Sequence, residues 1–283
     1  MHWEEDSPKA PTAAPDLRPL VEVPGAFLAL PRSPCPSFLA VVVCSPPDHT
    51  PERIAIRDTP DNPDPLGDSS IILESSLYGD VIWAQFADTI GNLTLKSLLL
   101  LQWTRTFCPS VSFVLKADDD VYVDLPGLVS LLEEKQAAMQ NGTLGEGEFL
   151  LGKLHRGKYA IRNHRLSTHV GPAAFRSSMV PSYLSGAAYV VPGAVVGPLL
   201  NRALEMPSLI LEDVFLTGII ATDLHLRRLH SACFACCDEL PDPCAYRGLL
   251  AATVSQPDTL RVVWERLHNA SLCPARSETA VEC

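Results

Sequence analysis

The stretch Val111–Asp124, VSFVLKADDDVYVD, decides the fold of this 283-residue chain. Its first part, Val111–Leu115, has the length and composition of a strand that is buried on both faces. Three aspartates, Asp118–Asp120, follow almost at once, and apolar residues resume at Val121. In an open α/β sheet, ligands bind at the carboxyl ends of the strands. The stretch therefore predicts a functional site at the end of a buried strand.

The chemistry of the three aspartates points to a cation. Adjacent carboxylates repel one another, and leaving them buried and unpaired destabilises a fold. A divalent ion removes that cost, because Mg²⁺ and Mn²⁺ prefer oxygen ligands and often bridge to a diphosphate. Residues two apart on a strand share a face, so Asp118 and Asp120 are the expected ligands while Asp119 points elsewhere. The alternative is a solvated acidic turn after a strand.

A second acidic pair, Glu212 and Asp213, follows the apolar residues Leu209–Leu211. Two interpretations stay open for this pair. Acids near the start of a helix are stabilised by the helix dipole, which would make them simple caps. A carboxylate at the mouth of a site can also act as a general base.

Apolar segments alternate between strand and helix patterns along the chain. Strands are expected at Phe38–Cys44, Ser75–Ile82, Val111–Leu115, Phe149–Gly152 and Tyr189–Val191, and helices at His49–Arg57, Asn92–Phe107, Pro126–Gln140, Ala194–Leu204 and Leu211–Ala221. This alternation predicts an α/β domain with a largely parallel sheet. Residues 1–24 are expected to be a disordered linker, and residues 25–283 a single domain.

Composition limits the class of protein. The net charge of −11 argues against a nucleic-acid-binding surface, which needs clustered Lys and Arg. Nine cysteines and three N-x-S/T sequons, at Asn92, Asn141 and Asn269, favour the secretory pathway. No membrane anchor is visible, because prolines and an arginine interrupt the apolar run Phe27–Cys44 and a spanning helix needs about 20 apolar residues.

Four cysteines near the carboxyl end form a cluster close to His230. They are Cys233, Cys236, Cys237 and Cys244. Zinc binding is one reading of this spacing. Disulfides in an exported domain are the favoured reading, because the cysteine count already indicates an oxidising compartment.

Five segments, taken in order, resemble the β1,3-glycosyltransferase family that contains β1,3-galactosyl- and β1,3-N-acetylglucosaminyltransferases. They are FLAVVVCSPPDHTPERIAIRDT (38–59), ESSLYGDVIWAQFADTIGNLTLKSLLLLQW (74–103), FVLKADDDVYVD (113–124), VPSYLSGAAYVV (180–191) and LEDVFLTG (211–218). The order of the motifs is far more specific than the aspartate triplet alone.

The resemblance implies a GT-A fold, which is Rossmann-like, with a mixed, mostly parallel sheet. It also implies an inverting hexosyltransferase that uses Mn²⁺ or Mg²⁺. Galactose or N-acetylglucosamine would pass from a UDP-sugar in β1,3 linkage to a glycan acceptor on a glycoprotein or glycolipid. The family is lumenal in the Golgi with type II membrane topology, so membrane association is expected although this sequence contains no evident anchor.

The resemblance also assigns site residues. The catalytic base would be Asp213, with Glu212 beside it. The donor-binding residues would be Arg53, Arg57, Lys116, Asp118 and Asp119. Ser185, Gly186 and Tyr189 would bind the acceptor. Asp118, Asp120 and His230 would hold the metal, although a surface histidine is the alternative for His230.

The sequence departs from the family between the first two motifs. Relatives carry a further apolar strand before the E-S-x-x-Y segment, and Asp58–Ser70, with four Asp and three Pro, cannot supply it. The loss of this nucleotide-binding strand would leave an unpaired sheet edge. It motivates an alternative function, in which a catalytically impaired relative acts as a sugar- or partner-binding module.

Overall fold

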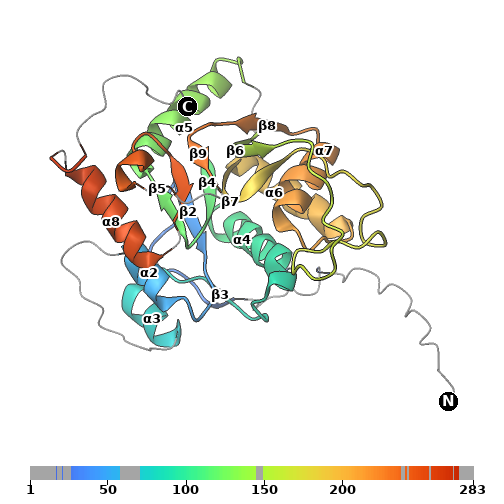
Figure 1. Cartoon of the computed structure of the whole chain (residues 1–283), viewed down its shortest axis with the longest axis horizontal. Coiled ribbons are helices and arrows are strands. Elements are labelled where there is room, and N and C mark those ends of the chain that lie inside the picture. The colour runs from blue at the N-terminus through green and yellow to red at the C-terminus, as the bar shows by residue number, and fades with distance from the viewer. Residues whose placement is uncertain are drawn as a thin grey trace.

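The computed structural model describes Leu17, Val21 and residues 27–57, 71–144, 149–236, 240, 242–254, 256–269 and 271–273. Within these residues a five-stranded sheet lies between two helical layers (Figure 1). Of the expected linker, residues 1–24, only Leu17 and Val21 are described. Val21 is buried in the main core and Leu17 packs against it, so at least this part of the segment is attached to the domain.

The central sheet has the strand order β2-β4-β7-β6-β8. Its strands are β2 (Leu39–Cys44), β4 (Phe113–Asp118), β7 (Tyr183–Pro192), β6 (Phe149–His155) and β8 (Arg227–His230). β2 is parallel to β4 and β6 is parallel to β8, whereas β7 is antiparallel to both of its neighbours. The sheet is mixed, as expected, but parallel and antiparallel pairs are equally frequent, so the expectation of a mostly parallel sheet was wrong.

Two smaller sheets and several helices complete the fold. The short strands are β1 (Phe27–Ala29) with β3 (Trp83–Ala84), and β5 (Val121–Val123), β10 (Ala251–Thr253) and β9 (Phe234–Ala235). The helices are α2 (Thr50–Arg57), α3 (Ile71–Tyr78), η1 (Ile90–Asn92), α4 (Leu93–Phe107), α5 (Leu125–Gln140), α6 (Gly193–Glu205), η2 (Val214–Ile220), α7 (Ala221–Asp223), η3 (Pro243–Tyr246) and α8 (Pro257–His268).

Packing on both faces of the sheet explains the apolar run Val111–Leu115 that leads into and begins β4. α4 and α6 pack with Val114 on one face of the sheet, and α5 packs with Phe113 and Leu115 on the other. Because helices cover both faces, all residues of β4 before Asp118 are buried. The first residue that can meet solvent is therefore the first aspartate of the triplet.

Most expected elements are confirmed, with ends shifted by a few residues, but the expected strand Ser75–Ile82 is wrong. Helix α3 occupies Ile71–Tyr78 and ends at Gly79, whose φ of 67° is the left-handed conformation that terminates helices. The apolar residues of this segment misled the prediction, because the buried side chain of α3 is a charged one, Glu74. The expected helix Leu211–Ala221 is confirmed, although Val214–Ile220 forms a π-helix.

β2 is an edge strand, and within the described part of the chain no strand pairs with its outer side. This agrees with the expected gap in the sheet, while residues 58–70 themselves lie outside the described residues. Among the described residues, no helix combines the length and apolar character that crossing a membrane requires.

Candidate active site

The acidic triplet lies at the carboxyl end of β4, where Asp118 is aligned with Cys44 at the end of β2. The carboxylates have different surroundings. The side chain of Asp118 is 41% exposed, whereas that of Asp119 is 8% exposed and accepts a hydrogen bond from His49 Nδ1 at 3.0 Å. Burial, together with the charges of Asp118 and Asp119, raises the pKa of Asp120. The structure thus holds mutually repelling carboxylates that a cation would stabilise.

Lys116 joins the triplet to the neighbouring strand. Its ammonium is buried, donates to Asp118 Oδ1 at 2.5 Å and also donates to the carbonyl oxygen of Gly186 on β7. Burial alone would lower the pKa of Lys116, but the charges of Asp118 and Glu212 outweigh it and hold the pKa well above its usual range. Because the ammonium is buried and paired, Lys116 holds Asp118 against the backbone of β7. This position does not favour the direct contact with the donor that the resemblance implies.

The second acidic pair has one buried and one partly open member. Glu212 is 7% exposed and accepts a hydrogen bond from Tyr189 Oη at 2.5 Å. Asp213 is half-buried, and its two oxygens accept from the backbone N–H groups of Gly186 (3.2 Å) and Val214 (2.8 Å). Burial raises the pKa of both acids, and for Asp213 the two N–H groups offset only part of that effect. Asp213 can reach a substrate, whereas Glu212 fixes Tyr189 inside the protein.

The three residues expected to bind an acceptor do not share one environment. Ser185 is 6% exposed and Tyr189 is 2% exposed, so both side chains belong to the interior rather than to a binding surface. Gly186 is half-buried and passes within reach of Asp213, since an added Cβ would lie 3.3 Å from the Cβ of Asp213. Of the three, only Gly186 stays a candidate for contact with a sugar.

His230 is not brought to the triplet. It lies on β8, and its register partners across the sheet are Gly152, Tyr189 and Lys116 in turn. With strands about 4.8 Å apart, its backbone is roughly 14 Å from that of Lys116. The ring Nδ1 accepts a hydrogen bond from Leu154 N at 3.3 Å. Among the described residues no group of three or more His, Cys, Asp or Glu is gathered for a metal ion, so Asp118 and Asp120 remain as the protein ligands to be considered.

Two arginines from α2 and two acids form a compact ion-pair cluster, which we call the arginine cluster: Arg53, Arg57, Glu74 and Asp80. Arg53 Nε and Nη2 donate to Glu74 at 2.7 and 2.8 Å, and Arg57 Nη1 donates to it at 2.6 Å. Arg57 also forms a two-pronged pair with Asp80, at 2.7 and 2.9 Å, and its guanidinium stacks 4.3 Å from the Tyr78 ring centre.

The arginine cluster changes the expected role of Arg53. Its remaining N–H groups donate to Ser45 Oγ, to the carbonyl oxygens of Pro46 and Pro47 and to Thr50 Oγ1. Every N–H of Arg53 is therefore used inside the protein, and the side chain has no donor left for a phosphate. Among the described residues, Arg57 uses three of its five N–H groups, so it stays a candidate for a nucleotide contact.

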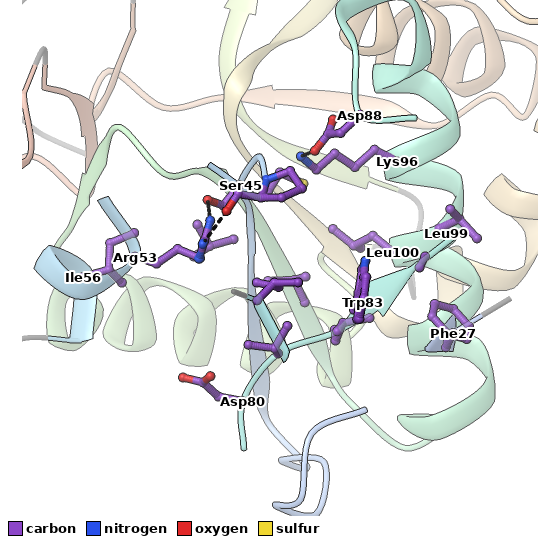
Figure 2. Close-up of a pocket in the computed structure, with 18 of the residues that line it drawn as sticks. Phe27, Ser45, Arg53, Ile56, Asp80, Trp83, Asp88, Lys96, Leu99 and Leu100 are labelled. Atoms are coloured by element: carbon purple, nitrogen blue, oxygen red, sulfur yellow. Dashed lines mark hydrogen bonds and ion pairs between the residues drawn. The ribbon is translucent and has the colours of Figure 1, made fainter. Parts of the chain in front are cut away.

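A cavity of about 380 Å³ opens beside β2 and is bounded by both arginines (Figure 2). Figure 2 shows Arg53 bonded to Ser45 on one side, Asp80 below them, and Trp83, Leu99 and Leu100 on the opposite wall. Lys96 lies at the rim, paired with Asp88 at 2.6 Å. The cavity is large enough for part of a drug-sized ligand and has apolar walls with polar groups at its edge, which is typical of small-molecule sites.

Sequence reasoning missed His155, at the carboxyl end of β6. Its ring packs against Tyr183 with centroids 5.1 Å apart, and Cys236 Sγ lies 3.5 Å from its Nε2. Burial and the charge of Lys158 lower the pKa of His155, while Asp213 raises it in part. Its place directly after an apolar strand was the available signal, because strand ends on that edge of the sheet bear the functional groups.

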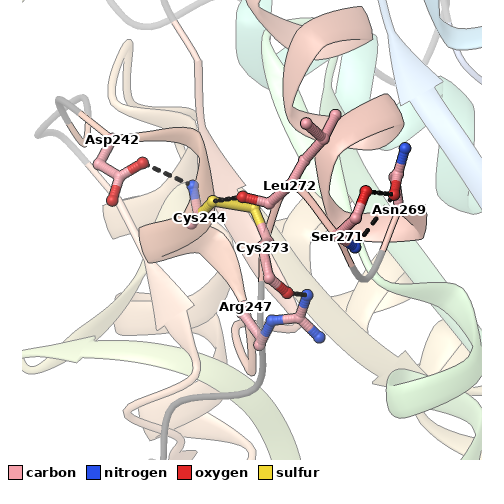
Figure 3. Close-up of a disulfide and its surroundings, with 7 residues drawn as sticks. All are labelled: Asp242, Cys244, Arg247, Asn269, Ser271, Leu272 and Cys273. Carbon is pink, nitrogen blue, oxygen red and sulfur yellow. Dashed lines mark hydrogen bonds between the residues drawn. A yellow bond between two sulfur atoms is a disulfide. The ribbon is translucent and has the colours of Figure 1, made fainter.

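The cysteines favour the disulfide reading over zinc. Cys244 bonds to Cys273, next to the hydrogen bond of Arg247 Nη2 to Cys273 O at 2.5 Å (Figure 3). Cys233 also takes part in a disulfide, which leaves it unable to bind zinc. A further disulfide joins Cys35 to Cys108. Cys237, the remaining member of the expected cluster, lies outside the described residues.

Comparisons with known proteins agree with the motifs. A family model described as galactosyltransferase matches residues 66–232. The chain is 31% identical to a β-1,3-galactosyltransferase of Rattus norvegicus over 88% of this chain and 80% of the relative. It is 32% identical to a lactosylceramide 1,3-N-acetyl-β-D-glucosaminyltransferase of Xenopus tropicalis, over 69% of this chain and 50% of that enzyme.

Among solved structures, a glycosyltransferase involved in glycosylation of the major capsid of PBCV-1 aligns with 81% of this chain and all of its own, at 11% identity and a TM-score of 0.41. The family assignment rests on the sequence matches, which cover more than half of the chain. With its mixed α/β sheet and its ordered motifs, the chain belongs to the galactosyltransferase family of β1,3-hexosyltransferases.

Proposed function

We propose that this chain is an inverting, metal-dependent hexosyltransferase that moves galactose or N-acetylglucosamine from a UDP-sugar to a glycan in β1,3 linkage. One observation carries the proposal. The backbone of Gly186 holds the two acidic motifs together, because its N–H donates to Asp213 and its carbonyl accepts from Lys116, which bonds Asp118. A candidate base and a candidate diphosphate-binding acid are thus both fixed to the backbone of one residue of β7, the base directly and the acid through Lys116.

Asp118 and Asp120 would hold the cation. Two carboxylates are enough for Mg²⁺ or Mn²⁺, because these ions usually complete their coordination with water and substrate phosphates. The raised pKa of Asp120 fits this interpretation, since it reflects burial and the like charges of Asp118 and Asp119, and a cation would offset both. When bound, the ion supplies Lewis-acid stabilisation of the departing UDP. His230 does not support this part of the proposal, given its place across the sheet.

Asp213 is the base. Its carboxylate accepts the proton of an acceptor 3-hydroxyl, whose oxygen attacks the anomeric carbon from the face opposite UDP, and the configuration inverts. Burial raises the pKa of Asp213, and a stronger base accepts a proton more readily. The N–H groups of Gly186 and Val214 fix the carboxylate so that its geometry is set before substrate arrives.

The cavity beside β2 is the place where the nucleotide would lie. It ends at the carboxyl end of β2, one strand away from Asp118, and Arg57 on its wall has a planar cation suited to phosphate or ring stacking. A lactosylceramide-acting relative supports a glycolipid as one acceptor class, with a glycoprotein glycan as the other. The disulfides support a lumenal compartment such as the Golgi.

The test is release of UDP from a panel of UDP-sugars, with and without Mn²⁺, using lactosyl and N-acetylglucosaminyl acceptors. We expect acceptor-dependent release from UDP-galactose or UDP-N-acetylglucosamine that needs the metal. The same panel on Asp213→Asn identifies background hydrolysis. UDP binding by calorimetry without any turnover would favour the binding-module alternative, and the absence of both binding and turnover would refute the proposal.

A further inference from the structure

Glu74 is a buried charged side chain that has no part in the proposed mechanism. It is 0% exposed, on the inner face of α3, and its two oxygens accept three hydrogen bonds from Arg53 and Arg57. Charge-assisted bonds of this kind are the strong and directional ones. A buried ion pair is weak evidence for a gain in stability, because desolvation offsets most of the attraction. We therefore look for the role of Glu74 not in stability but in the part of the chain that its ion pairs hold in place.

What the pair holds is the loop at the carboxyl end of β2. Within the described part of the chain, the other hydrogen bonds of the Arg53 guanidinium all go to this loop and to Thr50, where α2 begins. Its hydrogen bonds run to Ser45 Oγ at 2.8 Å, to Pro47 O at 2.9 Å, to Thr50 Oγ1 at 3.1 Å and to Pro46 O. Ser45, Pro47 and Arg53 itself line the cavity. Glu74 thus fixes the guanidinium, and the guanidinium fixes the cavity wall.

The same loop reaches the aspartate triplet. His49, between Pro47 and Thr50, donates from Nδ1 to Asp119 Oδ2 at 3.0 Å. Asp119 is flanked on either side by the two expected metal ligands. A series of hydrogen bonds therefore runs from Glu74 to Arg53 and from Arg53 to Pro46 O, which also accepts from the backbone N–H of His49 at 3.1 Å, and the ring of His49 bonds Asp119.

We propose that Glu74 is a positioning residue, which sets the loop Ser45–Thr50 through Arg53 and thereby places both the nucleotide-side wall of the cavity and Asp119. The proposal rests on the proposed function for the nature of the ligand, but the placement of the loop does not depend on it. Burial alone would raise the pKa of Glu74, yet Arg53 and Arg57 outweigh it and keep the pKa low. The carboxylate therefore stays ionised at neutral pH, and its hold on the loop is constant there.

The experiment compares Glu74→Gln with Asp223→Asn. Asp223 is a matched control, because it forms a two-pronged pair with Arg202, at 2.6 and 3.2 Å, on the remote helices α6 and α7. The first readout is amide hydrogen exchange without any substrate. We expect Glu74→Gln to speed exchange in residues 45–53 and 116–124 and to leave α6 unchanged, while Asp223→Asn leaves both segments unchanged.

The second readout is kinetic. Glu74→Gln should raise KM for the UDP-sugar by about tenfold to a hundredfold, with KM for the acceptor unchanged and kcat within about threefold, because a misplaced wall weakens donor binding. Glu74→Asp should recover part of the loss. A merely structural role would instead reduce the active fraction, which lowers kcat and leaves both KM values alone.

Two results would overturn the proposal: unchanged exchange in residues 45–53, or faster exchange spread over the whole sheet. If Glu74→Gln does not fold, Arg53→Lys replaces it, since a lysine keeps the charge beside Glu74 but cannot span the loop acceptors. The same local exchange signature is then required. An inactive wild-type chain would refute the proposed function alone, because the exchange readout needs no activity.

Discussion

The two charged regions beside β4 differ in their balance. The acidic half consists of Lys116, the triplet Asp118–Asp120, Glu212 and Asp213, so one lysine faces five carboxylates. The arginine cluster on the β2 side sets two cations against two anions, Glu74 and Asp80. One region carries an excess of negative charge, and the other is neutral.

That difference separates a reactive region from a supporting one. In the acidic half, burial raises the pKa values of both Glu212 and Asp213, and the neighbouring charge of Asp213 adds to the effect on Glu212. Such perturbed acids in one place are typical of functional sites. In the arginine cluster the charges are matched within the protein, and Arg53 has no hydrogen-bond donor left for a ligand. In the proposed mechanism, the charge-matched arginine cluster therefore supports the cavity wall, and the acidic half with its excess negative charge binds the ion and reacts.

The largest effect should come from removing the base. Asp213→Asn is expected to lower kcat by roughly a hundredfold to ten-thousandfold, which is the range of general-base catalysis. The amide keeps one oxygen acceptor, so one of the two hydrogen bonds from the N–H groups of Gly186 and Val214 is lost and the melting temperature should fall by only about 2–4 °C. Acceptor-dependent UDP release gives the rate and circular dichroism the melting temperature. Turnover at the wild-type level would remove Asp213 from the mechanism.

The next effect concerns stability and tests the excess of negative charge in the acidic half. Lys116→Met leaves Glu212, which is 7% exposed, without its cation and should cost about 3–5 kcal/mol of unfolding free energy, as for a broken buried pair. Arg57→Met is the control, because Asp80 is 48% exposed and can turn to water, while Glu74 keeps both of its hydrogen bonds to Arg53. Urea unfolding of both variants measures the difference. Equal losses would mean that the two regions are not electrostatically distinct.

A smaller gain should follow cation binding. At a Mn²⁺ concentration about 100 times the dissociation constant, the native state should gain about 2.7 kcal/mol, if the unfolded chain does not bind. The gain should disappear in Asp118→Asn/Asp120→Asn and on adding a chelator. Thermal unfolding at several Mn²⁺ concentrations measures it. Stabilisation that persists in the double variant would locate the ion elsewhere.

The smallest effect is a displacement of the pH profile. Burial raises the pKa of Asp213, so the carboxylate takes up its proton at a higher pH than an exposed aspartate would. Since only the ionised form accepts the acceptor's proton, kcat/KM should fall on the acidic side at that higher pH. The profile is measured with near-UV circular dichroism at each pH as a check of folding. A limb at the value of an exposed aspartate, about 3.9, would contradict the assignment.

The acidic half could be predicted from the sequence because its signals are local. Asp118–Asp120 and Glu212–Asp213 each follow an apolar run, and strand ends bear ligands. The burial of Lys116, Ser185 and Tyr189 could not be predicted from the sequence, because it depends on helices that come from distant segments and pack on the sheet. Position across the sheet is equally nonlocal, and the expectation that His230 lies near the triplet came from the family resemblance alone.

The arginine cluster was hidden by a wrong element. A strand over Ser75–Ile82 would send alternate side chains to opposite faces, whereas helix α3 turns Glu74 inward to meet α2. The residues themselves lie in the segments that resemble the family: Arg53 and Arg57 in 38–59, and Glu74 at the start of 74–103. Their pairing could be found only once the segment was known to be helical.

The Cys35–Cys108 bond divides these two regions in the covalent topology of the chain. All members of the arginine cluster lie inside the ring that this bond closes, and all members of the acidic half follow it in sequence. A polypeptide synthesised in a reducing cytosol would lack this disulfide. Residues 35–108 would then be cut by proteases more easily than in the oxidised protein. Expression in an oxidising host is therefore the condition under which the nucleotide side of the enzyme should be assayed.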